Sequence, residues 1–196
     1  VASGETAGGG VWWRDHPREC RNACSTLPAA ALALRIHRHR PDPTLVDFAH
    51  RQVTWTDRHL VDGTGLVADN IDNAGVVEPT VWAYNQGSYV AATALLAHAT
   101  GDADVHRAAR RAASAALDRL GGDGWWHQPP AFVGVGFRNL LALAAVERLG
   151  DLPDGLDPDV ALADRIIGEL DAYLDRVWAD ARDPHTGWCT AGGIAA

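Results

Sequence analysis

The chain has 196 residues, of which 47% are hydrophobic and 21% charged, and its net charge is −8 at neutral pH. This composition is typical of a globular domain and excludes a disordered polyelectrolyte. No basic stripe stands out to replace phosphate counterions, and no uninterrupted apolar run approaches the ~20 residues of a membrane span. We therefore predict neither a nucleic-acid nor a membrane partner.

The first predicted helix follows apolar positions from Leu27 to Leu34, spaced three and four residues apart, and ends in a basic segment at 35–40. Basic side chains suit the negative end of a helix, so we interpret the segment as a solvated helix end. A second, amphipathic pattern follows over residues 45–60. The two patterns predict a helical hairpin.

Cysteines before this hairpin raise the question of a metal site. Cys20 and Cys24 lie four residues apart, with His16 four residues earlier, but Pro17 interrupts the helical spacing. A free cysteine is commonly a small buried hydrophobe, which is the interpretation we prefer. We predict no metal and no organic cofactor.

Two further helix pairs follow at intervals of about 60 residues, a period typical of repeated helical hairpins. They are predicted over 80–99 with 104–120, and over 136–149 with 159–180. Within each pair the turn is marked by a Gly-Asp or Pro-Asp dipeptide, whose aspartate or a neighbour can cap the next helix. Between pairs, glycine-containing turns predict short sheet pieces near 63–68, 122–128 and 186–190.

The first helix of each pair is poorer in charge than the second, and 80–99 contains no Asp, Glu, Lys or Arg. This contrast predicts an inner ring of helices enclosed by an outer ring. We expect an all-α, (α/α)6-toroid type of fold, here a single partial α/α toroid domain over 1–196 with about three hairpins. A plain helical solenoid is the alternative, and it would show less contrast.

Aromatic residues are confined to one kind of link. Links within pairs have none, whereas those between pairs contain or lead into Trp12, Trp13, Trp82, Tyr84, Trp125, Trp126, Phe132, Phe137 and Trp188. We expect these aromatics at one end of the helical layer, opposite Asp42, Asp102 and Asp151. Trp55 and Trp178 fall in outer helices and are interpreted as packing residues.

The same end collects amides and acids: Asn22, Asp69, Asn70, Asp72, Asn73, Glu78, Asn85, Gln86 and Gln128. Flat aromatic faces beside such groups suit sugar rings, whose C–H faces stack while their hydroxyls form hydrogen bonds. For any single tryptophan a packing role is the stronger interpretation, but the cluster favours a glycan cleft.

Two stretches resemble a known enzyme family. Residues 8–15 (GGGVWWRD) with 21–26 (RNACST), and then 80–87 (TVWAYNQG), are similar to motifs of glycoside hydrolase family 76, and 137–139 (FRN) is similar to a weaker later pattern. The order of the motifs is that of the later part of the family's fold, an (α/α)6 toroid. The resemblance implies endo-hydrolysis of α-1,6-mannan with retention, so an α-mannan-like polysaccharide is the expected partner.

The resemblance also implies which residues form the site. The residues expected to line the glycan cleft are Trp12, Trp13, Asn22, Trp82, Tyr84, Asn85, Gln86 and Arg138. By their position on the same side, Asp72 and Glu78 are further candidates for binding sugar hydroxyls, with solvated loop carboxylates as the alternative. Gly87 is expected to permit close helix packing. The family's catalytic groups are an adjacent aspartate pair upstream of the Gly-Gly-Gly stretch, and this sequence contains no Asp-Asp dipeptide. Asp102 and Asp104 are read as a turn and helix cap, so no catalytic residue is assigned.

We therefore expect the chain alone to be inactive and to need a missing N-terminal half or a second copy to close the ring. An extracellular location suits the substrate, although no signal peptide is visible. The alternatives are a non-catalytic glycan-binding module and a protein-binding helical module. Other toroids, such as sugar epimerases and unsaturated glucuronyl hydrolases, remain possible on fold alone.

Overall fold

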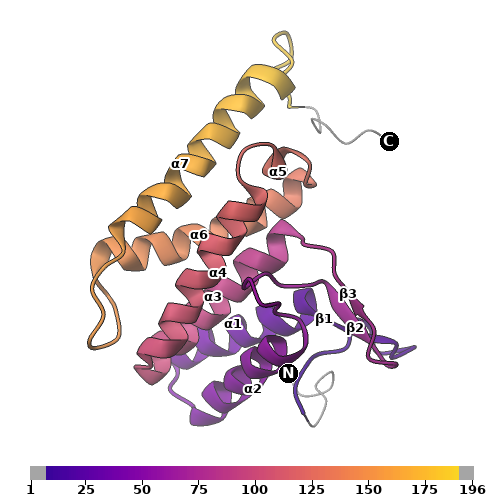
Figure 1. Cartoon of the computed structure of the whole chain (residues 1–196), viewed down its shortest axis with the longest axis vertical. Coiled ribbons are helices and arrows are strands. Elements are labelled where there is room, and N and C mark those ends of the chain that lie inside the picture. Colours follow the sequence, from indigo (N-terminus) through magenta and orange to yellow (C-terminus); the bar gives the residue numbers. More distant parts are fainter. Residues whose placement is uncertain (1–7, 190–196) are drawn as a thin grey trace.

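The computed structural model describes residues 8–189 and consists of three helical hairpins (Figure 1). The hairpin helices are α1 (Ala23–His39), α2 (Pro43–His59), α3 (Ala83–Thr100), α4 (Ala103–Leu120), α6 (Pro130–Leu149) and α7 (Val160–Arg176). A short helix, α5 (Asp123–Trp126), precedes α6, and a π-helical turn, Val177–Ala181, follows α7. The predicted number and order of the hairpins are confirmed.

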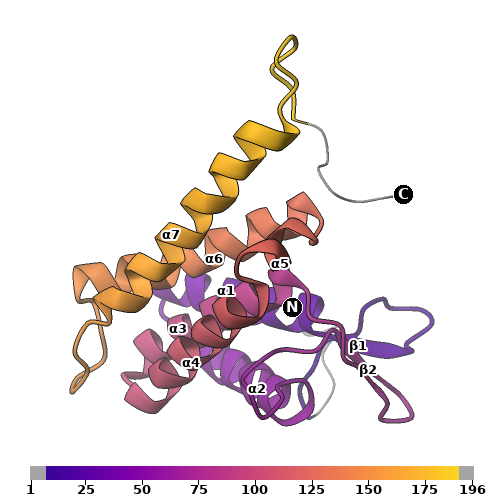
Figure 2. The same cartoon turned by 45° about the horizontal axis from the view of Figure 1, so that its top comes forward.

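The first helices of the pairs form one layer. Helix α3 contacts α1 on one side and α6 on the other, while α2, α4 and α7 pack against their own partners on the outside. The uncharged sequence of α3 is explained by this position, because most of its residues are buried. Figure 2 shows α7 leaning away from the other helices toward its C-terminal end.

Aspartate caps begin the second helix of each pair. The Asp42 carboxylate accepts a hydrogen bond from the Thr44 N–H at 3.0 Å, and Asp102 accepts one from the Asp104 N–H at 2.8 Å. In the third pair the cap is Asp159, which accepts from the Leu162 N–H at 2.9 Å. Two of the predicted Asp-containing turns, at Asp42 and Asp102, are therefore helix starts, whereas Asp151 of the third precedes the start of α7 by nine residues.

The starts of α3 and α6 differ from the prediction. Helix α3 begins at Ala83 rather than at residue 80, because Trp82 has an extended backbone. Helix α6 begins at Pro130, six residues before the predicted start at 136. Proline is well tolerated in the first turn, where its missing N–H would have no helical partner.

The sheet lies elsewhere than predicted. Its strands are β1 (Cys20–Asn22), β2 (Asn70–Asp72) and β3 (Val77–Glu78), antiparallel in the order β1-β2-β3. Near 63–68 the structure has only the isolated bridge Val61–Val67, and 122–128 forms α5 instead of a strand. The third predicted piece reduces to the bridge Arg182–Cys189, and residue 190 lies outside the described part.

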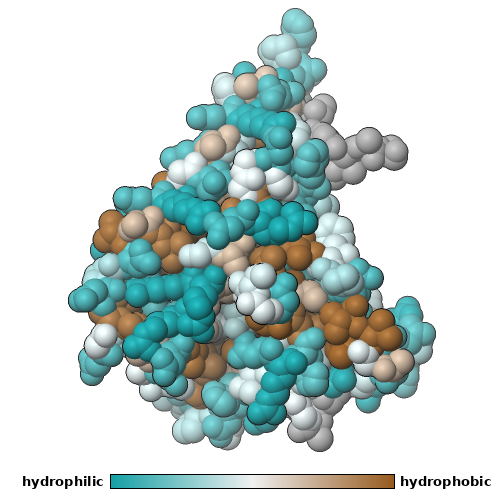
Figure 3. Space-filling view, in the orientation of Figure 1, coloured by the Kyte–Doolittle hydropathy of each residue, from teal (hydrophilic) through white to brown (hydrophobic). Residues whose placement is uncertain are grey.

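A half-ring would leave its inner helices without partners on one side, so the uncharged sequence of 80–99 predicts a large exposed apolar surface there. The structure contradicts this, because α1, α4 and α6 cover α3. Exposed apolar side chains are scattered over other elements, and hydrophilic residues separate the hydrophobic patches seen in Figure 3. Trp55 is a packing residue, 2% exposed, as predicted. The prediction for Trp178 is wrong: it is 66% exposed, and the Arg182 guanidinium lies over its ring.

Helix α6 has the length and apolar composition that would also allow a membrane span. It packs against α3 and α7, and residues such as Phe137 and Leu140 are buried there. The protein core therefore accounts for the apolar character of this helix.

Candidate functional site

Polar side chains converge on Asp69, where the link before α3 passes the N-terminal ends of α1 and α3. The backbone carbonyl of Asp69 accepts a hydrogen bond from the Ala23 N–H at 2.9 Å. Its carboxylate Oδ1 accepts from the Tyr84 hydroxyl at 3.2 Å and from Asn85 Nδ2 at 3.0 Å. Asn70 Nδ2 donates to the other oxygen at 3.0 Å. A carboxylate suits this place because helix N-termini carry partial positive charge.

An aromatic group adjoins this polar cluster. The Tyr84 ring meets the Phe132 ring edge to face with centroids 4.4 Å apart, and Trp82 meets Phe132 in the same way at 5.4 Å. All three side chains are half-buried, so part of each faces solvent. Helices α3 and α6 thus bring a partly exposed aromatic surface next to the Asp69 carboxylate, as sugar recognition requires.

Electrostatics around the cluster keep its neighbouring groups protonated. Burial and then the nearby Asp69 charge raise the pKa of Tyr84 well above its ordinary value. Burial, followed by the same charge, also raises the pKa of the Cys24 thiol. Tyr84 is therefore a neutral hydroxyl at physiological pH, and Cys24 is a poor nucleophile.

Gln86 does not line a cleft. It is 1% exposed, its Oε1 accepts from the Val67 N–H at 2.9 Å, and its Nε2 donates to the Val67 carbonyl at 2.8 Å. The amide thus pairs with both backbone groups of one residue and fixes the link onto α3. This corrects the expectation that Gln86 contacts a ligand directly, because a buried amide with satisfied bonds supports the site from beneath.

Asn85 and Asn22 are also buried, at 0% and 7% exposure. Asn85 orients the Asp69 carboxylate, and Asn22 ends β1, where it pairs in register with Asn70. Neither reaches solvent as a cleft-lining side chain would. The motif therefore places Tyr84 at the surface and Asn85 and Gln86 behind it.

Two of the three glycines in the Gly-Gly-Gly stretch, Gly9 and Gly10, pack closely on α2. The Gly10 N–H donates to Gln52 Oε1 at 2.8 Å, and a Cβ on Gly10 would lie 2.6 Å from the Trp55 ring. Its φ of +81° is also a conformation that side chains disfavour. These glycines fix the segment that leads to Trp12 and Trp13.

The two tryptophans after this stretch differ in exposure. Trp12 is half-buried and forms a backbone bridge with Arg21, whose guanidinium lies 5.6 Å from the Trp12 ring centroid. Trp13 is 58% exposed. Both precede β1, which leads into α1 beside Asp69, so they lie at the expected end of the layer.

The carboxylates Asp72 and Glu78 serve local turns. Asp72 Oδ1 accepts from the N–H groups of Ala74 and Val76, both at 2.8 Å, and Glu78 Oε1 accepts from the Thr80 hydroxyl at 2.6 Å. These bonds give Asp72 a structural role in the β2–β3 turn and give Glu78 one at the end of β3. A role in sugar binding, expected from their position, has no support in their contacts.

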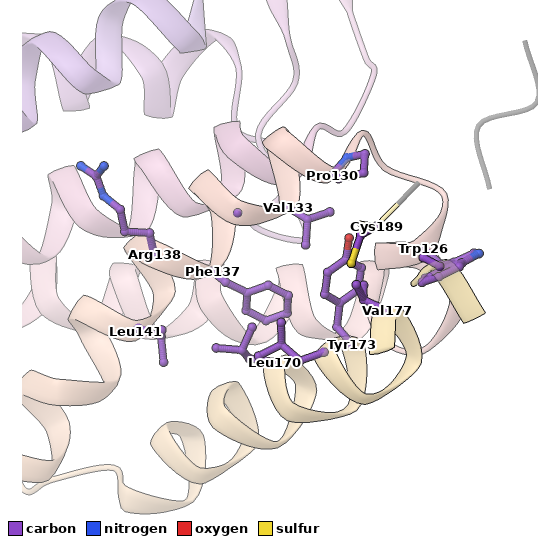
Figure 4. A pocket seen from close by; sticks show the side chains of 13 residues that line it. Trp126, Pro130, Val133, Phe137, Arg138, Leu141, Leu170, Tyr173, Val177 and Cys189 are labelled. Carbon is purple, nitrogen blue, oxygen red and sulfur yellow. The ribbon is translucent and has the colours of Figure 1, made fainter. Parts of the chain in front are cut away.

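Arg138 lies on the exposed face of α6, at a groove of about 600 Å³ between α6 and α7. Figure 4 shows Phe137, Leu170 and Tyr173 gathered in this groove, with Arg138 pointing away from them. Phe137 is 2% exposed and packs on Trp125 with ring centroids 4.5 Å apart. Phe137 is thus a core residue, and the groove is mostly apolar.

The opposite end of the layer carries the links within pairs. His98 at the end of α3 lies 3.8 Å from Asp151 in the link after α6, and both line a second pocket together with Arg38 at the end of α1. The ends of the inner helices with Trp82 and Tyr84 are therefore opposite those with Asp151. As predicted, the links between pairs lie at one end of the layer and the links within pairs lie at the other.

Within residues 8–189, no group of three or more His, Cys, Asp or Glu side chains is placed to hold a metal ion. The sequence singled out Tyr84 but missed the importance of Asp69 and Phe132. Asp69 was one acid among several in the link, and Phe132 fell before the predicted start of its helix. The local sequence carried no signal for Asp69, because only the folded chain brings it between two helix N-termini.

Comparisons with known proteins place this arrangement in a family. The sequence model of glycosyl hydrolase family 76 matches residues 2–124. A protein of Candida glabrata described as mannan endo-1,6-alpha-mannosidase DCW1 is 34% identical over 107 residues, which cover 50% of this chain and 24% of that protein. A Schizosaccharomyces pombe protein, meiotically up-regulated gene 191 protein, is 33% identical over 99 residues, 45% of this chain and 22% of that one.

Solved structures show the same fold. An α-1,6-mannanase from Salegentibacter sp. HEL1_6 has a TM-score of 0.75 and 26% identity, covering 93% of this chain and 55% of that one. A family 76 mannosidase from Bacteroides thetaiotaomicron has a TM-score of 0.76 at 19% identity, covering 98% of this chain and 54% of that one.

The chain therefore spans about half the length of these solved relatives, and its three hairpins are a partial (α/α)6 toroid. The family model covers well over half of the chain, including the Gly-Gly-Gly stretch and the Tyr-Asn-Gln-Gly stretch, whose Tyr84 and Asn85 contact Asp69. By this match the chain is a member of glycosyl hydrolase family 76.

Proposed function

We propose that this chain supplies the glycan-binding side of a retaining glycoside hydrolase that acts on α-1,6-linked mannan or a related α-mannoside polymer. The observation that carries the proposal is the partly exposed surface of Trp82, Tyr84 and Phe132 beside the Asp69 carboxylate. It offers a stacking face and directional acceptors in one place, as sugar sites do. We take residues 1–196 as one partial toroid domain.

The relatives support the choice of glycan. Inactive variants of the Salegentibacter enzyme, each with two consecutive aspartates replaced, are described in complexes with an α-1,6-linked mannotetraose and mannotriose. Both are 26% identical to this chain and cover 93% of it. An α-1,6-mannooligosaccharide is therefore the ligand with which to test this site.

The proposal assigns no catalytic pair to the chain. Retaining hydrolysis needs a nucleophile and an acid/base carboxyl about 5–5.5 Å apart. The sequence contains no adjacent aspartates, and the nearby acids Asp72 and Glu78 are engaged in turns. We propose that a missing N-terminal half or a second copy completes the ring. A non-catalytic glycan-binding module is the second candidate, favoured by the same lack of an aspartate pair.

Titration calorimetry and a hydrolysis assay test both statements. We expect the purified chain to bind α-1,6-mannotetraose without releasing products. Replacing Trp82 with alanine should weaken binding about tenfold or more, because a stacked aromatic is lost. Trp178→Ala is the matched control, since that tryptophan is 66% exposed on another element. Product formation would contradict the proposal that the chain lacks a catalytic carboxylate pair. An equal loss of mannotetraose binding in the Trp82 and Trp178 variants would contradict the proposed position of the binding site.

A further inference from the structure

The hydrogen bond between Tyr84 and Asp69 has a fixed direction. An ionised carboxylate can only accept, so the Tyr84 hydroxyl must donate its proton to Asp69 Oδ1, 3.2 Å away. The Cys24 thiol also interacts with this hydroxyl, but a carboxylate is the stronger acceptor. Once its proton is committed, Tyr84 Oη faces any ligand as an acceptor.

The Asp69 carboxylate can accept a further hydrogen bond. Its Oδ1 receives the Tyr84 hydroxyl and Asn85 Nδ2, while from residues 8–189 its Oδ2 receives only Asn70 Nδ2. A carboxylate offers about four acceptor positions, so one position on Oδ2 remains. Asp69 is half-buried rather than enclosed, so a ligand can reach it. The surface therefore presents two acceptors, one of them charged.

We infer that Asp69 is a positioning and specificity-determining residue, which orients Tyr84 as an acceptor and selects neutral, hydroxyl-donating sugars over acidic ones. The inference rests on the proposed function of the same site and goes beyond it by naming what the site rejects. A neutral glycan donates two hydroxyl protons to Tyr84 and Asp69. A uronic acid or sugar phosphate brings a second negative charge to Asp69, and like charges at close range are unfavourable.

If the Asp69 side chain had a purely structural role, its carboxylate would be needed to hold the link in place. The backbone carbonyl of Asp69 already ties the link to α1 through Ala23, and Gln86 ties it to α3 through Val67. Both ties are independent of the carboxylate. Asp69→Asn should therefore keep the link in place while it removes the charge and turns one acceptor into a donor.

The first experiment measures selectivity by calorimetry on the full chain, with α-1,6-mannotetraose and tetragalacturonate as probes. We expect the native chain to bind only the neutral probe. Asp69→Asn should bind mannotetraose about tenfold more weakly, since a hydrogen bond to a charged group is lost, and should discriminate less against the acidic probe. Tyr84→Phe should add little further loss in the double variant, because the two residues act together.

A second experiment tests the contact without a ligand. The chain has three tyrosines, so ¹³C-tyrosine NMR can follow each phenol through a pH titration. Asp69→Asn should lower the pKa of Tyr84 toward its ordinary value and leave Tyr89 unchanged. The matched control is Asp57→Asn, because Asp57 accepts the Tyr89 hydroxyl at 2.5 Å; it should lower the pKa of Tyr89 alone.

The outcomes separate the two proposals. If the native chain binds neither oligosaccharide, the proposed function fails, and the selectivity inference fails with it, whatever the tyrosines do. If the native chain binds mannotetraose but Asp69→Asn binds both probes as the native chain does, only this inference is overturned. An unchanged Tyr84 titration in Asp69→Asn would overturn the positioning role by itself.

Discussion

Gln86 illustrates how a polar residue in a ligand-associated motif can act from inside the protein. Its amide bonds both the N–H and the carbonyl of Val67, a pairing that resembles one rung of a sheet. Val67 is fully buried, so no water is at hand to replace these bonds. The Tyr84 side chain, two residues earlier, is held beside Asp69 because the link carrying Asp69 is fixed in this way.

Gln86→Ala should therefore lower stability first. The substitution leaves two buried backbone groups unpaired, at a cost of about 1–3 kcal/mol each. We expect a clear fall in the urea midpoint, measured by circular dichroism. Asn73→Ala is the control, since Asn73 is exposed and its side chain donates to the Arg18 carbonyl at the surface. An unchanged midpoint with weaker mannotetraose binding would restore a direct ligand role for Gln86.

At the scale of single residues, the sequence predicted well what a short motif contains. Tyr84 and Gly87 could be identified because both belong to one contiguous motif, the Tyr-Asn-Gln-Gly stretch. Asp69 could not be ranked above Asp72 by the same means. Their different roles arise from three-dimensional surroundings: Asp69 meets two helix N-termini, whereas Asp72 caps its own turn.

Between elements, the closest approach is that of α3 and α6. A Cβ on Gly87 would lie 2.5 Å from the Gly136 carbonyl oxygen, and one on Gly136 would lie 2.9 Å from the Ala83 carbonyl oxygen. The two glycines therefore let the helix backbones touch. This contact sets the position of Phe132 on α6 relative to Tyr84 on α3.

Gly87→Ala should destabilise the protein by about 1–3 kcal/mol, as overpacking does. It should also reduce mannotetraose binding, because α6 must move away from α3. Gly134→Ala is the control on α6, where a Cβ meets no atom within 4 Å and alanine favours the helix. Thermal unfolding would contradict this account if the two variants had equal midpoints.

The outer helices are joined to the inner layer by a buried ionic network. Glu147 is fully buried and accepts from Arg110 Nε at 2.7 Å, His106 Nε2 at 2.7 Å and the Asp159 N–H at 2.8 Å. Burial alone would raise the pKa of Glu147, but the bonds from Arg110, the Asp159 backbone and His106 together hold it below its ordinary value. Helices α4, α6 and α7 meet at this carboxylate.

A depressed carboxyl pKa makes stability depend on pH with a definite sign. The contribution of Glu147 is fully present above its unfolded pKa of about 4.3 and is lost as the pH falls through the lower folded value. We expect the unfolding free energy to decrease below about pH 4. Glu147→Gln should be less stable at pH 7 and show a shallower acid slope, measured by urea titration at several pH values. An identical slope would contradict the assignment.

The pairing of the helices was predictable because characteristic turn residues lie within each hairpin and between hairpins. The exact ends of the helices, in contrast, depend on tertiary contacts. Pro129 and Pro130 precede the predicted helix start at 136, yet Pro130 begins α6 and the Pro129 carbonyl accepts from the Phe132 N–H at 2.8 Å. The start of α3 is likewise fixed from outside, since Gln128 Oε1 accepts from the Ala83 N–H at 3.0 Å. Contacts of this kind have no signal in local periodicity.

For the whole molecule, the open side is the groove between α6 and α7. Its lining is mostly apolar, and Leu174, which lines it, is 51% exposed. Helix α7 leans outward along this groove (Figure 2). Within the described residues no element covers it, whereas α3, in the middle of the layer, has helices on both sides.

An exposed apolar groove of this kind favours association. In a pure preparation a second copy is the available partner, so we expect the molar mass to rise with concentration in analytical ultracentrifugation. Leu174→Asp should suppress that rise, because a charge in the contact would have to be desolvated. Leu149→Asp is the control, being 82% exposed at the C-terminal end of α6 and not among the residues that line the groove. A chain that stays monomeric at every concentration would show that exposure of this groove to water does not drive self-association. It would also refute the proposal that a second copy completes the ring.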